Sequence, residues 1–238
     1  MKNILTIFFK ELKSYFNSPV AYIFIITFLL FSSWLFFRTF FLAGQAHMRP
    51  LFGILPWLFL ILAPAITMRA WAEEKKMGTM EVLMTLPLKE FEVVLGKFFS
   101  SFIFMIIAVV LTFPLALTIY IMGDPDTGAI LGGYLGACLM GGAYLAIGLF
   151  ISSLTSNQII AFIVSIVTCF AFLIIGEDFV LMSTPSMIVP IFTYLGLGAH
   201  FESISRGVID SRDIIYYLSV IGFFLFLNTL AIESRKWK

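Results

Sequence analysis

One polar stretch interrupts an otherwise apolar chain: residues 69–83 read RAWAEEKKMGTMEVL. Extended to residue 97, this segment holds five of the fifteen basic residues and five of the fourteen acidic ones. Long apolar runs lie on both sides of it. A polar helical segment in such a position can meet a water-soluble partner. The alternative is a solvated loop with local charge pairs worth roughly 0.3 kcal/mol each, and spacing alone leaves both open.

The composition is that of a membrane protein. Hydrophobic residues make up 61% of the 238-residue chain and charged residues 12%, against roughly 25% charged residues in soluble domains. The mean hydropathy is +1.03. The net charge of +1 is spread over loops and forms no basic patch, so no nucleic-acid partner is expected. Cys138 and Cys169 fall inside apolar runs and are expected to be buried thiols.

The apolar runs predict an all-α, polytopic membrane protein with six transmembrane helices, since a spanning helix needs about 20 apolar residues. The six runs are residues 19–37, 51–68, 98–122, 129–153, 158–176 and 214–232. Residues 1–18 carry apolar side chains at helical spacing and predict an amphipathic helix in the membrane interface. The chain thus divides into this helix and one transmembrane domain, residues 19–238.

The basic residues predict the orientation. With the N-terminus in the cytoplasm and six spans, eleven basic residues fall inside and four outside. The opposite orientation inverts this ratio. No cleavable signal peptide is evident. We therefore expect both termini, with Arg235-Lys236-Trp237-Lys238, and segment 69–97 to lie in the cytoplasm.

Residues 179–199 are long and apolar enough for a seventh span. Pro185 and Pro190 interrupt the stretch, and a seventh crossing would move the basic C-terminus outside. We expect instead that residues 179–213 form a re-entrant or interfacial segment on the outer side.

Small residues recur every four positions in the fourth span, at Gly128, Gly132 and Gly136. This spacing lets two helices approach closely. The contact can be with another subunit or within the same bundle, and the pattern favours neither.

Motifs for catalysis and metal binding are absent from the sequence. His47 and His200 lack the spacing of a zinc hydrolase, and no metal site is expected. There is no Gly-x-Ser-x-Gly elbow and no phosphate-binding loop, because Gly96-Lys97 is followed by Phe98 and lacks the upstream glycine. We expect no enzyme and no cofactor bound by this chain.

Segment 69–97 itself is expected to hold two short helices. The first would end near Gly78, a plausible C-cap. The second would run from Thr79, a reasonable N-cap, to Leu86, before Pro87, with Glu81 in its first turn.

The stretch EEKKMGTMEVLMTLP at residues 73–87 resembles the cytoplasmic loop of ABC-2 type transporter permeases. Residues 95–97, 156–158 and 200–210 are similar to the gliding-motility-associated permease subunit (GldF type). The resemblance implies a six-span domain in the bacterial inner membrane, surrounded by lipid. It also implies that segment 69–97 is a coupling helix docked on a separate ABC ATPase, whose two copies would bind ATP and Mg²⁺. The implied contact residues are Glu73, Glu74, Gly78, Thr79, Glu81 and Leu83.

The resemblance further implies a second permease subunit, either a paralogue with an outer domain or another copy of this chain. ATP hydrolysis would drive export or movement across the membrane. The alternative is a scaffold that moves no substrate and transmits motion to an outer partner. An intramembrane enzyme is disfavoured because no catalytic constellation is present.

Overall fold

The protein is a bundle of helices. A computed structural model describes residues 2–44, 47–85, 87–123 and 125–234, and this part of the chain contains no strand. The predicted all-α fold is confirmed. The helices that run along the bundle are α2 (Pro19–Ala43), α3 (Arg49–Lys76), α5 (Glu90–Val110), α6 (Phe113–Met122), α7 (Thr127–Leu154), α8 (Gln158–Ile174) and α12 (Ser211–Glu233). The others are α1 (Lys2–Asn17), α4 (Thr79–Thr85), α9 (Asp178–Leu181), α10 (Val189–Leu195) and α11 (Leu197–Ser205).

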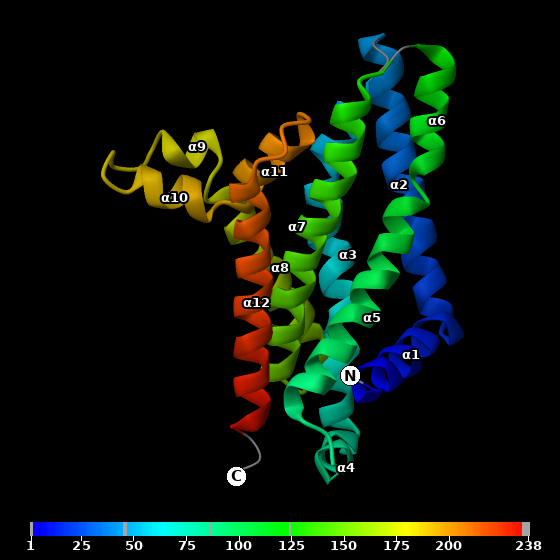
Figure 1. Cartoon of the computed structure of the whole chain (residues 1–238), viewed down its shortest axis with the longest axis vertical. Coiled ribbons are helices and arrows are strands. Elements are labelled where there is room, and N and C mark those ends of the chain that lie inside the picture. The colour runs from blue at the N-terminus through cyan, green and yellow to red at the C-terminus, as the bar shows by residue number, and fades with distance from the viewer. Residues whose placement is uncertain (1, 45–46, 86, 124, 235–238) are drawn as a thin grey trace.

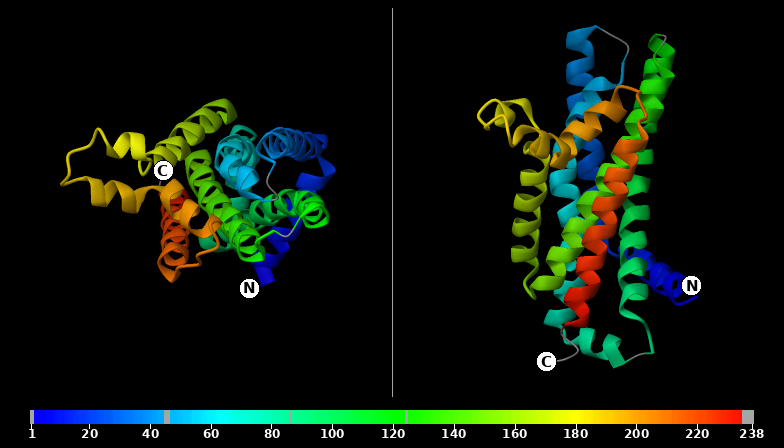
Figure 2. Two further views of the ribbon diagram at one scale, coloured as in Figure 1. Left: turned by 90° about the horizontal axis from the view of Figure 1, so that it is seen from above. Right: turned by 60° about the vertical axis from the view of Figure 1, so that its left-hand side comes forward.

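The long helices lie side by side, and α7 is their centre (Figures 1 and 2). It packs against α3, α5, α8, α11 and α12. The most apolar 18-residue stretch of α7 is 78% buried, whereas the corresponding stretch of α12 is 22% buried. The end of the bundle that carries α4 also carries α1 and the last turn of α12 (Figure 1); we call it the α4 end. The basic residues Arg235, Lys236 and Lys238, used for the predicted orientation, lie outside the described residues.

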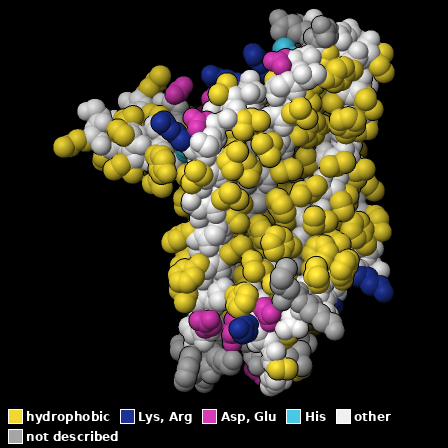
Figure 3. All heavy atoms as spheres, viewed as in Figure 1, with side chains coloured by type: hydrophobic (Ala, Val, Ile, Leu, Met, Phe, Trp, Pro, Cys, Tyr) yellow, Lys and Arg dark blue, Asp and Glu magenta, His cyan; other side chains and the backbone are white. Residues whose placement is uncertain are grey.

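Five segments of the described chain are long and apolar enough to cross a membrane: Pro19–Leu42, Arg49–Lys76, Glu90–Met122, Thr127–Leu154 and Ser211–Glu233. The remaining predicted span is α8, which is apolar but has 17 residues. At about 1.5 Å per residue it is about 25 Å long, somewhat less than the roughly 30 Å hydrocarbon core. Hydrophobic side chains cover the middle of the bundle and charged ones gather at its two ends (Figure 3).

The third predicted span, residues 98–122, is two helices. A turn at Leu111 and Thr112 separates α5 from α6. Pro114 lies in the first turn of α6, where its missing N–H and fixed φ are tolerated, whereas inside a continuous helix its ring would clash with the preceding turn. The Thr112 hydroxyl donates to the Val109 carbonyl, 2.7 Å away.

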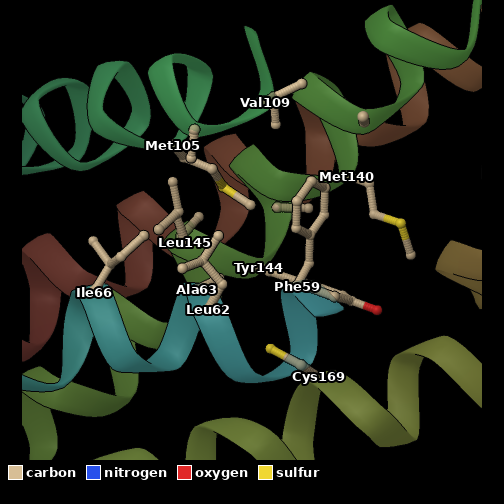
Figure 4. Close-up of a cluster of buried hydrophobic side chains, with 14 of the residues drawn as sticks. Phe59, Leu62, Ala63, Ile66, Met105, Val109, Met140, Tyr144, Leu145 and Cys169 are labelled. Carbon is tan, nitrogen blue, oxygen red and sulfur yellow. The ribbon is translucent and has the colours of Figure 1, made fainter. Parts of the chain in front are cut away.

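The core lies between α3, α5, α7 and α8. Phe59 and Ala63 of α3, Met105 of α5 and Tyr144 of α7 are among the buried side chains there (Figure 4). Cys169 of α8 is buried in the same cluster, as predicted. Cys138 is partly exposed, and neither thiol forms a disulfide.

The regularly spaced glycines of α7 meet different neighbours. A Cβ at Gly132 would lie 2.5 Å from the Ile204 carbonyl oxygen of α11, and one at Gly136 would lie 3.2 Å from Ile204 Cγ2. These two therefore serve close packing within the same bundle. The neighbour of Gly128 is Asp126 Oδ1, the side chain that caps α7, at 3.2 Å from a Cβ. Tertiary packing thus distinguishes residues that the sequence pattern made equivalent.

Residues 179–199 form short helices rather than one long one. α9 and α10 project sideways from the bundle near the end opposite α4 (Figure 1), and α11 returns to pack on α7. His200 holds α11 in this position against the bundle. Its Nδ1 lies 2.7 Å from Asp213 Oδ1, its Nε2 lies 3.0 Å from the Tyr194 carbonyl, and its ring stacks on Tyr216.

Candidate functional site

The predicted loop 69–97 is mostly helix, and its first part belongs to a spanning helix. α3 continues without a break from Arg49 to Lys76, so the expected short helix before Gly78 is the end of α3. Trp71 and Ala72 are fully buried. The chain from Glu90 onward is already α5. Only residues 77–89 connect the two long helices.

Ser152 and Ser153 of α7 form hydrogen bonds with the end of α3. The backbone N–H groups of Trp71 and Ala72 donate to Ser152 Oγ, both over 3.2 Å, and that hydroxyl donates to the Met68 carbonyl over 3.1 Å. Lys75 donates to the backbone carbonyl of Ser153. The end of α3 is therefore fastened to the central helix by polar contacts as well as by packing.

Gly78 makes the turn from α3 into α4. Its φ of 69° lies in the left-handed region, which favours glycine. The Thr79 hydroxyl donates to the Glu74 carbonyl over 3.3 Å, so it contacts the end of α3 rather than capping its own helix as predicted. α4 starts at Thr79 as expected and ends at Thr85, and Leu86 lies outside the described residues.

The seven residues of α4 present two faces. Met80 is buried and Leu83 is partly buried against the core, whereas Glu81 and Val82 are exposed. The inner face holds α4 to the bundle, and the outer face leaves an acidic and an apolar side chain accessible. Gly78 and Thr79 are exposed beside them.

Glu74 points inward to a buried lysine. Lys97 Nζ lies 2.7 Å from Glu74 Oε1 and 3.2 Å from Glu11 Oε1, and the Lys97 side chain is only 3% exposed. The same ammonium lies 4.9 Å from the centre of the Trp71 ring. Charge-assisted hydrogen bonds and the aromatic face compensate the desolvation of this cation. Lys97 thereby joins α1, α3 and α5.

The N-terminal helix is docked along α5 as well as being amphipathic. Gly96 allows the contact, because a Cβ there would lie 2.7 Å from Ile7 Cγ2. The Tyr15 hydroxyl lies 3.0 Å from Ser101 Oγ and donates to the Ile66 carbonyl over 3.3 Å. Burial raises the pKa of this phenol, which keeps it neutral. Leu5 and Phe9 remain exposed, as an interfacial helix requires.

A hollow of about 390 Å³ opens between α1, α2, α3 and α5 at the α4 end. We call it the head cavity. Its walls include the charged residues Lys10, Glu11, Arg69, Glu73, Glu74 and Lys97. Glu73 is half-buried and Arg69 is exposed. Of the six predicted contact residues, Glu73 and Glu74 thus line this cavity, while Gly78, Thr79 and Glu81 lie on the outer surface.

Sequence reasoning missed the pairing of Lys97 with Glu11, which are 86 positions apart. A signal was present, since Lys97 stands directly before a strongly apolar run and an unpaired charge there would be costly. The sequence named no partner for it.

The opposite end holds a smaller group of acidic residues. Glu177 lies between α8 and α9, and burial, together with the carboxylates of Glu202 and Asp178, raises its pKa. His200 is engaged by Asp213 and Tyr194. Within the described ranges, no group of three or more His, Cys, Asp or Glu side chains could hold a metal ion.

Comparison with protein families assigns nearly the whole chain to a single family. The model of the ABC-2 family transporter proteins matches residues 5–231, which leaves out only the first residues of α1 and the residues from 232 onward. Comparison with curated proteins finds no match, so the assignment rests on the family as a whole. The chain belongs to the ABC-2 family of transporter proteins, whose members are membrane permeases.

Proposed function

We propose that this permease docks a separate ABC ATPase on its α4 end and couples ATP hydrolysis there to export or movement across a bacterial inner membrane. The observation that supports this proposal is the exposed face of α4, which lies beside the anchored end of α3. A short helix that is fixed on one face and presents Glu81 and Val82 on the other is suited to fit a groove on a partner. The excess of basic residues in the segments at this end supports a cytoplasmic location for it and for both termini.

Motion at α4 has a direct route into the bundle. α4 is joined through Gly78 to α3, and α3 is fastened to α7 by Ser152. Closure of an ATPase pair would therefore move α3 and α7 together as a rigid body. ATP and Mg²⁺ would be bound by two ATPase copies, since this chain has no phosphate-binding loop.

The ATPase contact would consist of Glu73, Gly78, Thr79 and Glu81, to which we add the exposed Val82. Glu74 and Leu83 would support this surface from within, because both are directed at the bundle. A second permease would complete the complex, either a paralogue with an outer domain or another copy of this chain. The similarity to the GldF type favours the paralogue.

The alternative function is transmission of motion to an outer partner without moving a substrate. The projecting segment of α9 and α10 favours it, because Phe179, Met182, Met187 and Ile191 are all largely exposed there. Substrate-stimulated ATPase activity of the reconstituted complex would support transport. ATPase activity that responds to an outer protein and to no substrate would support transmission.

Glu81→Lys tests the docking site. The charge reversal is expected to reduce recovery of the ATPase with the purified permease by roughly tenfold, because basic groups on the partner would then be repelled. Membrane insertion should be unchanged, since Glu81 is exposed. Co-purification from membranes and ATPase activity of the complex are the measurements.

Glu233→Lys is the matched control, because Glu233 is an exposed acidic residue at the same end of the bundle. It should leave recovery unchanged. If the Glu81 variant binds the ATPase and hydrolyses ATP normally, α4 is not the docking element.

A further inference from the structure

The head cavity adjoins a second hollow of different chemistry. This groove has a volume of about 470 Å³ and lies between α2, α3 and α8. Its lining side chains are apolar except for Thr27; they include Ile23, Phe31, Leu58, Ile61 and Met68. Phe24 and Ala65 line both hollows. The charged cavity and the apolar groove therefore adjoin each other at these two residues.

The charges of the head cavity balance. Three cations (Lys10, Arg69 and Lys97) face three anions (Glu11, Glu73 and Glu74). Lys97 is already engaged with Glu11 and Glu74. Arg69 and Glu73 are one helical turn apart on α3, so their side chains are neighbours. A ligand with one positive and one negative group, separated by a short link, matches this pair better than a purely anionic or cationic ligand does.

The position and length of the two hollows match one leaflet of a bilayer. α1, whose Ser14 and Tyr15 line the head cavity, has the exposed apolar side chains of an interfacial helix. The apolar groove, which takes the acyl chain, extends from Ile23 to Phe31, about 12 Å along α2 at about 1.5 Å per residue. Half of a bilayer's hydrocarbon core is about 15 Å.

We propose that the head cavity and groove together bind one zwitterionic phospholipid from the leaflet at the α4 end. Its ammonium group, as in phosphoethanolamine, lies against Glu73, and its phosphate lies toward Arg69 at the exposed rim. One acyl chain follows Phe24 and Ala65 into the groove. The lipid fills the space between α1 and α3, and α3 contacts α4. Glu73 also belongs to the proposed ATPase contact, but the lipid binds to the chain without the ATPase.

The test uses the purified full-length chain, reconstituted in vesicles of equal parts phosphatidylethanolamine and phosphatidylglycerol and then extracted into detergent. Native mass spectrometry counts the lipids retained per chain. The expected result is one phosphatidylethanolamine, preferred over phosphatidylglycerol by roughly tenfold. Equal retention of the two lipids, or preference for phosphatidylglycerol, would overturn the proposal.

Two variants address the two parts of the site. Thr27→Trp fills the groove from an exposed position, and Glu73→Lys reverses the charge that meets the ammonium group. Each should lower retention of phosphatidylethanolamine by roughly tenfold. The controls Thr39→Trp, at an exposed threonine of α2 outside the groove, and Glu233→Lys should retain the lipid. Helical circular dichroism establishes that each variant is folded, and unchanged retention in folded Thr27→Trp contradicts the proposal.

Two further experiments distinguish the intact lipid from a free headgroup and from a second copy of the chain. Excess glycerophosphoethanolamine, which has the headgroup without acyl chains, should not displace the bound lipid; displacement would show that the groove contributes nothing. The oligomeric state of Thr27→Trp should equal that of the unmodified chain. A dimer that dissociates in this variant while lipid retention is unchanged would mean that a second copy covers the groove.

Discussion

Replacement of Lys97 by methionine is expected to lower the free energy of unfolding by about 3–5 kcal/mol, the usual cost of removing one partner of a buried ion pair. Methionine keeps much of the side-chain volume, so the effect comes from charge. Glu74 and Glu11 would lose the cation that lies 2.7 and 3.2 Å from their carboxylates. Trp71 would lose its cation contact as well. Unfolding in detergent, followed by helical circular dichroism, measures the change.

The double variant Lys97→Met with Glu74→Gln should recover part of that loss. Glutamine removes the uncompensated charge, so the two substitutions should be less than additive, as expected for residues in contact. Lys13→Met is the control, because Lys13 is an exposed lysine on α1, and it should change stability by less than about 0.5 kcal/mol. Equal stability of Lys97→Met and Lys13→Met would mean that the charge cluster does not hold α1 to α3 and α5.

Gly132→Ala should destabilise the bundle by about 1–3 kcal/mol, the cost of overpacking a filled interior. The added methyl group would lie 2.5 Å from the Ile204 carbonyl oxygen and 3.2 Å from Gly207 Cα. Both of these atoms belong to the backbone, which cannot move away as easily as the end of a flexible side chain can. α11 would have to move away from α7. Thermal unfolding of the purified chain, with cysteine crosslinking between α7 and α11, follows the change.

Gly222→Ala is the matched control. Gly222 lies in the interior of α12, and a Cβ there would meet no atom within 4 Å. Alanine should be neutral or stabilise the helix by up to about 1 kcal/mol, because it has the higher helix propensity. If the Gly132 and Gly222 variants are equally stable, the close approach of α11 to α7 is not required for folding.

Much of the helical architecture follows from local pattern. Apolar runs of spanning length predicted where the long helices lie, because a chain in lipid must satisfy its backbone polar groups internally. Pro185 and Pro190 correctly argued against one continuous helix over residues 179–199. The turn at Gly78 was also predicted, since a positive φ at a helix end favours glycine. These features depend on residues close together in the sequence.

The candidate site was only partly predictable. The charges of residues 73–76 indicated a segment in water, so the end of α3 was expected to be a separate short helix. Burial of Trp71 and Ala72 depends on Ser152, about eighty positions further along. Glu74 was expected at the ATPase contact because of the resemblance to the permease loop. Its true neighbour, Lys97, is defined by the packing of α3 beside α5.

The sequence by itself determined that this is a membrane-embedded helical protein with one concentrated polar segment, because hydropathy and helix-breaking residues act locally. Only the tertiary structure decided which side of that segment is accessible. It turned Glu74 toward Lys97 and left Glu81 exposed, since a buried charge must have a partner and the partners come from distant helices. It likewise decided that Gly132 contacts α11 within the same chain, because identical spacing in one helix says nothing about which neighbour each glycine faces.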